Sequence, residues 1–89
     1  MAKDLSEMSE EEKSIAEADK IISDPKSEKD KVVEAYYNRG LAKYELSDYS
    51  GAIEDYDKAI EIDPNNEDAY KCRENALERL EQQNKGAVL

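Results

Sequence analysis

The fold is decided by residues 34–66, which read EAYYNRGLAKYELSDYSGAIEDYDKAIEIDPNN. Apolar residues recur there at intervals of three and four, which predicts two amphipathic helices joined by a short turn at residues 47–49. Asp63 and Pro64 end the second helix, because proline lacks a backbone donor and pushes the preceding residue out of the helical region. The stretch therefore predicts an antiparallel helical hairpin.

A copy of the first helix follows this hairpin. Residues 34–46 align with residues 68–80 without a gap, at one fixed offset of 34 residues. The identical pairs are Ala35/Ala69, Tyr36/Tyr70, Arg39/Arg73, Ala42/Ala76 and Leu46/Leu80. Self-similarity at a period of this length predicts a stack of similar helical units.

Several positions of the hairpin match a known repeat pattern. They are a large aromatic, a small residue, an alanine and aromatic pair, and a closing proline, at Tyr36, Gly40, Ala52, Tyr56 and Pro64. On these residues the chain resembles the tetratricopeptide repeat family, and YYNRG at residues 36–40 is similar to bacterial forms of the repeat. Arg39 and Lys43 depart from the leucine and tyrosine of that pattern.

The resemblance implies an all-α fold of about four helices, in which antiparallel hairpins form a short right-handed solenoid. We expect a polar lead-in over residues 1–8 and a single domain over residues 9–83. The parts of the domain are a degenerate half-repeat at 9–25, the full repeat at 33–66 and a capping helix at 67–83, followed by a tail at 84–89.

The half-repeat has its own helix signals. Ser9 and Glu12 have the spacing of a capping box, and the helix stops before Pro25. Residues 18–25 echo residues 56–64 with one residue missing, so this helix corresponds to the second helix of a repeat whose first helix is absent. Further signals predict the ends of the other helices, with Ser27 and Asn66 as N-caps and Gly86 as a C-terminal residue.

Packing of the hairpin is predicted from its small residues. Gly40 in mid-helix costs about 1 kcal/mol relative to alanine, so we expect a close approach by the following helix through Ala52 and Ala59. The polar face of that helix is expected to be solvated; it carries Glu54, Asp55, Lys58 and Glu61.

The composition narrows the function. Thirteen basic against twenty-three acidic residues give a net charge of −10, which repels phosphate backbones and anionic lipids, so we expect no nucleic-acid or membrane partner. The absence of a long apolar run or signal sequence predicts a cytoplasmic protein. With no histidine and the single cysteine Cys72, we expect no catalytic site, no metal site and no cofactor.

The resemblance implies a non-catalytic adaptor or scaffold that binds a peptide or partner helix on its concave face. Carried over by position, the exposed residues of that face are Glu34, Tyr37, Asn38, Leu41 and Glu45 from one helix, and Asp68, Lys71, Cys72 and Asn75 from the next. Tyr37 and Leu41 have an alternative role, which is to pack against neighbouring helices. Lys71 and Asn75 also match the first two residues of the clamp by which some family members bind chaperone C-termini, but the remaining clamp residues are missing.

Self-assembly is the alternative function. The half-repeat lacks its partner helix, which leaves an apolar edge around Ile15, Ile21 and Ile22. Because isolated hairpins cannot bury their apolar faces alone, we expect a weak homodimer that stacks through this N-terminal edge.

Overall fold

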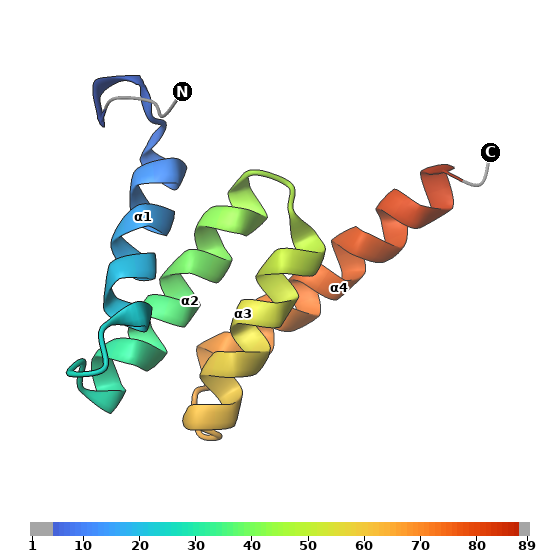
Figure 1. Ribbon diagram of the computed structural model, residues 1–89. Coiled ribbons are helices and arrows are strands. Elements are labelled where there is room, and N and C mark those ends of the chain that lie inside the picture. The colour runs from blue at the N-terminus through green and yellow to red at the C-terminus, as the bar shows by residue number, and fades with distance from the viewer. Residues whose placement is uncertain (1–4, 88–89) are drawn as a thin grey trace.

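The computed structural model describes residues 5–87, and this part of the chain folds into four α-helices after one short 3₁₀ turn. The elements are η1 (Leu5–Glu7), α1 (Glu10–Ser23), α2 (Lys29–Glu45), α3 (Tyr49–Ile62) and α4 (Glu67–Ala87). Consecutive helices pack on one another, and α4 crosses behind α3 (Figure 1). The all-α fold expected from the sequence is confirmed, while the predicted tail residues Val88 and Leu89 lie outside the described residues.

Two predicted caps are present. The Ser9 hydroxyl accepts a hydrogen bond from the Glu12 amide at 3.1 Å, and the Glu12 carboxylate accepts one from the Ser9 amide at 3.2 Å. The Asn66 side chain accepts a hydrogen bond from the Ala69 amide at 3.1 Å, at the start of α4. Each of these bonds satisfies an amide that has no partner within its helix, which explains why α1 and α4 begin where they do.

Two other predicted helix ends are wrong. Glu28, rather than Ser27, precedes α2, and the Ser27 hydroxyl donates instead to the Ile21 carbonyl at 2.6 Å. Gly86 lies inside α4, which continues beyond residue 83 to Ala87. Gln82, Gln83 and Lys85 near its end are good helix formers, and Lys85 pairs with Glu81 one turn earlier at 3.3 Å.

The turn between α2 and α3 is short and strained at one residue. Ser47 has a φ of 64°, in the left-handed region that non-glycine residues rarely adopt. The Asp48 carboxylate caps α3 by accepting a hydrogen bond from the Gly51 amide at 3.1 Å. This tight turn holds α2 and α3 as antiparallel neighbours.

Gly40 is closely approached by α3, as predicted, but the neighbour is an aromatic ring. A Cβ atom placed on Gly40 would lie 2.6 Å from Cε1 of Tyr56, and Tyr56 is completely buried. The α3 side chain nearest to Gly40 is therefore Tyr56, rather than the expected Ala52 or Ala59. The absence of a side chain at Gly40 creates the space that the Tyr56 ring occupies.

The prediction that Asp55 is solvated is also wrong. Asp55 is only 2% exposed and lies between two cationic side chains of α2. Arg39 donates from Nε to Oδ2 at 2.9 Å and from Nη2 to Oδ1 at 2.7 Å, and Lys43 Nζ lies 3.2 Å from Oδ2. These hydrogen bonds to Asp55 are the main reason why the pKa of Arg39 is raised. Arg39 and Lys43 are the two departures from the family pattern. Their positive charges neutralise the negative charge of the buried Asp55 carboxylate.

Arg39 also connects α2 to α1. Its Nη1 donates to Asp19 Oδ1 at 2.8 Å, so one guanidinium group contacts α1 and α3 from α2. The Asp19 carboxylate is more than half exposed, and such a bond adds little stability by itself. The bond lies where α1 contacts α2, and those two helices form the walls of a groove.

Candidate protein-interaction groove

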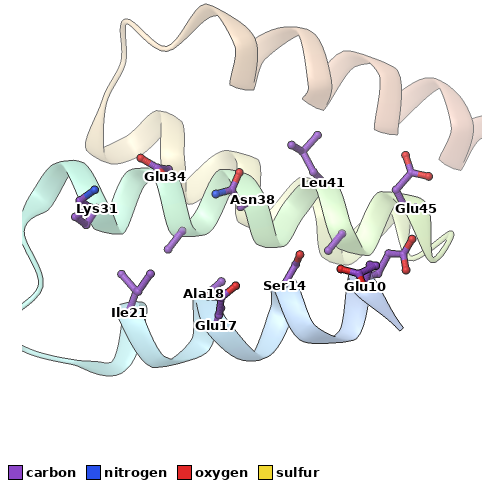
Figure 2. Close-up of a pocket in the computed structure, with 13 residues that line it drawn as sticks. Glu10, Ser14, Glu17, Ala18, Ile21, Lys31, Glu34, Asn38, Leu41 and Glu45 are labelled. Carbon is purple, nitrogen blue, oxygen red and sulfur yellow. The ribbon is translucent and has the colours of Figure 1, made fainter. Parts of the chain in front are cut away.

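An open groove of about 490 Å³ lies between α1 and α2. Its buried lining residues are small, namely Ala18, Ala35 and Ala42, and they form the floor. The remaining lining residues are Glu10, Glu11, Ser14, Glu17 and Ile21 from α1, and Lys31, Glu34, Asn38, Leu41 and Glu45 from α2 (Figure 2). A narrow apolar floor with a polar rim is suited to a segment of polypeptide.

The groove exists because each helix presents one continuous face to it. Its α2 residues recur at intervals of three and four from Lys31 to Glu45, and its α1 residues do the same from Glu10 to Ile21. This spacing is that of one side of an α-helix. The opposite side of α2 is occupied by α3, so the groove face of α2 is the one that the hairpin leaves open.

The groove is strongly acidic. Five carboxylates and one ammonium group line it. Among residues 5–87, Glu17, Glu34 and Glu45 form no ion pair, and Glu10 makes only a 3.9 Å contact with Lys13 at the surface. The negative charge is therefore not neutralised within this part of the chain, and it favours a cationic partner.

Of the site residues predicted on α2, four line this groove: Glu34, Asn38, Leu41 and Glu45. Tyr37 is not among the lining residues. Its ring centroid lies 6.0 Å from that of Tyr56, and its hydroxyl is 3.5 Å from the Cys72 sulfur. The hydrogen bond to Cys72, followed by burial, raises the pKa of Tyr37 to about 12. Tyr37 thus packs from α2 against α3 and α4, which is the alternative role considered for it, namely packing against neighbouring helices.

Comparison with known families now agrees with the hairpin geometry. Residues 33–66, which comprise most of α2 and all of α3, match the family model of the tetratricopeptide repeat. The chain contains a tetratricopeptide repeat. Such repeats generally mediate contacts between proteins. No solved structure matches the chain.

The residues predicted on α4 lie apart from the groove. Asp68, Lys71 and Asn75 are exposed on α4, and none of them lines the space between α1 and α2. Cys72 is half-buried against Ala52, Tyr56 and Ala76. The structure therefore brings together four of the five α2 residues of the predicted concave face, but none of the α4 residues.

Sequence reasoning missed the contribution of α1 to this groove. Ser14, Glu17 and Ile21 form its second wall. Of these, only Ile21 was expected at an interaction surface, as part of the apolar edge for self-association. The signal was the alignment of residues 18–25 with the second helix of the tetratricopeptide repeat. A second helix without its first helix must leave its inner face open.

The described residues offer no metal site and no membrane span. Within residues 5–87 there is no group of three or more histidine, cysteine or acidic side chains that could hold a metal ion. None of the helices in the same part of the chain has the length and apolar character needed to cross a membrane.

Proposed function

We propose that the groove between α1 and α2 binds a segment of a partner protein, and that the chain is a non-catalytic interaction module. The observation that supports this most directly is the uncompensated polar lining of the groove. Asn38 is exposed at its centre with no hydrogen bond among residues 5–87, and its amide can offer two donors and an acceptor to a peptide backbone. Leu41 supplies apolar contact area beside it.

The proposed partner carries basic residues. The net charge of −10 and the carboxylates of the groove favour cationic segments and disfavour nucleic acid and anionic membranes. Because the carboxylates are solvent-accessible, affinity should fall as salt is raised.

Binding of a panel of basic, neutral and acidic peptides, measured by fluorescence anisotropy, tests this function. The variant Asn38→Ala/Leu41→Ala removes groove contacts without changing the charge. Leu41 also packs against the buried cluster around Tyr56, so circular dichroism must first show that this variant keeps the wild-type helix content and melting temperature. Glu54→Ala is the control, since Glu54 is exposed on α3 and does not line the groove. Tyr37 is left unchanged because its replacement would disturb the packing with Tyr56. We expect the basic peptides to bind and the double variant to lose binding; equal binding by both variants would contradict the proposal.

Self-association is the second candidate, and one observation favours it. Tyr70 is 39% exposed and Leu77 is 48% exposed, on an outer face of α4. Ile15, Ile21 and Ile22, which formed the predicted N-terminal edge, are each only partly exposed. Light scattering over a concentration series, with Leu77→Glu beside Ile15→Glu/Ile22→Glu, distinguishes the two surfaces. A monomer at every concentration would remove this candidate.

A further inference from the structure

The contact between α1 and α2 repeats the contact between α3 and α4. Arg39 Nη1 donates to Asp19 at 2.8 Å, and Arg73 Nη1 donates to Asp57 at 2.9 Å. Each arginine also lies over a tyrosine one turn earlier, at 5.5 Å from the Tyr36 centroid and 5.3 Å from that of Tyr70. The sequence alignment likewise pairs Asp19 with Asp57. α1 therefore has the same relation to α2 that α3 has to α4.

This equivalence shows what belongs in the groove. The buried residues of α3 are Ala52, Asp55, Tyr56 and Ala59. Of these, Asp55 bonds Arg39 and Tyr56 packs against Gly40, both on α2. The counterparts on α1 of these four α3 residues, at the same offset as Asp19 and Asp57, are Ser14, Glu17, Ala18 and Ile21, and all four line the groove. The groove is thus bounded by the α1 surface to which a helix equivalent to α2 would bind, and this chain provides no such helix within residues 5–87.

The residues of α1 that line the groove specify two features of that helix. Asp55 on α3 binds Arg39 and Lys43, which are four residues apart on α2. Its counterpart Glu17 has no partner among the described residues. Tyr56 is replaced by Ala18, so the residue that corresponds to Gly40 no longer meets an aromatic ring.

We propose that the groove binds an amphipathic helix of a partner protein, which takes the position of the missing first helix of the preceding repeat. This helix carries an arginine and a lysine four residues apart, both directed at Glu17, and a large apolar residue directly after the arginine, directed at Ala18. The proposal rests on the proposed function and adds the conformation and chemistry of the partner. The acidic rim supplies the charge complementarity, since five carboxylates face one lysine there.

A synthetic peptide tests the proposal. It copies the 17 residues of α2, with Gly40→Leu to fill the space over Ala18, and with Asp30, Glu34 and Glu45 changed to glutamine to remove its acidic groups. One control peptide carries Arg39→Glu and Lys43→Glu. A second control carries Tyr37→Pro, which prevents helix formation. The protein variant is Glu17→Lys, and Glu54→Lys is its control, because it makes the same change in net charge on an exposed α3 position outside the groove.

We expect the parent peptide to bind wild type and Glu54→Lys equally, and to bind Glu17→Lys about tenfold more weakly. The charge-reversed peptide should show the opposite preference and bind Glu17→Lys more tightly than wild type. Equal affinity for wild type and Glu17→Lys, or equal binding of the proline peptide, would overturn the helix proposal. The helix proposal could fail in this way while the Asn38→Ala/Leu41→Ala variant still lost its binding of basic peptides. The groove would then remain the interaction site, but its partner would not be a helix of this kind. If neither this peptide nor any peptide of the basic panel bound, both proposals would be overturned. If wild type formed a dimer that Glu17→Lys dissociates, the occupant of the groove would be a second copy of this chain instead.

Discussion

Arg39 donates two hydrogen bonds to the buried carboxylate of Asp55, at 2.9 and 2.7 Å, and so places a guanidinium group in the seam between α2 and α3. Both residues stand on helices whose outer faces are polar, yet only 3% of the Asp55 side chain is exposed, against 20% for Arg39. A carboxylate that is buried to this extent depends on its partners, because charge removed from water without compensation is strongly unfavourable.

Removal of Asp55 should therefore be costly. We expect Asp55→Ala to lower the free energy of unfolding by about 2–4 kcal/mol, because Arg39 and Lys43 then remain in the seam without their counter-charge. Urea denaturation followed by circular dichroism measures this. Asp57→Ala is the control; its side chain is 53% exposed, and its bond to Arg73 should contribute less than about 1 kcal/mol. The triple variant Arg39→Leu/Lys43→Leu/Asp55→Leu removes the whole charged cluster and should stay within about 1 kcal/mol of wild type. A loss as large as that of Asp55→Ala would contradict this explanation of the cluster.

Gly40 should not tolerate a side chain. Alanine in a helix is favoured over glycine by about 1 kcal/mol, but here its Cβ would lie 2.6 Å from the buried Tyr56 ring. We expect Gly40→Ala to lower stability by about 1–3 kcal/mol in thermal or urea unfolding. In a Tyr56→Leu background the ring is gone, and the same change should become neutral or stabilising. A higher melting temperature for Gly40→Ala alone would mean that the α2–α3 seam has room for a methyl group.

Asp55 and Gly40 also show what the sequence can and cannot predict. A close approach at Gly40 is predictable because a glycine in mid-helix lowers helix stability and so indicates a compensating contact, and the Ser9 and Asn66 caps follow from purely local chemistry. The burial of Asp55 is not local, because it depends on a cation sixteen residues away on another helix. The usable signal is the presence of Arg39 at a position where the family has an apolar residue. Only the α2 wall of the groove was predicted, and the other wall comes from α1. The face of α1 is open because residues 5–87 contain no first helix to pack against it.

The Tyr56 hydroxyl should be dispensable. It is buried without a hydrogen-bond partner among residues 5–87, and its burial raises the pKa of this tyrosine. Since a buried polar group without a partner is unfavourable, we expect Tyr56→Phe to raise stability by about 1 kcal/mol. Tyr37→Phe is the matched change, which removes a hydroxyl that bonds Cys72 and should give no gain. Destabilisation by Tyr56→Phe would reveal a partner for this hydroxyl.

Alkaline pH should weaken the fold partly through Tyr37. Its pKa in the folded protein is about 12, above the ordinary value of 10.0, so the folded state favours the neutral hydroxyl. The resulting stabilisation is complete below pH 10 and is lost as the pH rises from 10 towards 12. Urea midpoints measured from neutral pH to about pH 11 should fall less steeply for Tyr37→Phe than for wild type. An unchanged slope in Tyr37→Phe would contradict this assignment.

The central claim is that the face formed by α1 and α2 is the interaction surface, and chemical-shift mapping tests it most directly. Isotope-labelled protein is titrated with the arginine- and lysine-bearing α2 peptide while its backbone amide signals are followed. We predict that the largest changes occur at groove residues of both helices, including Ser14, Ala18, Asn38 and Leu41. Changes centred instead on the exposed α4 face around Leu77, or no changes at saturating peptide, would contradict the claim.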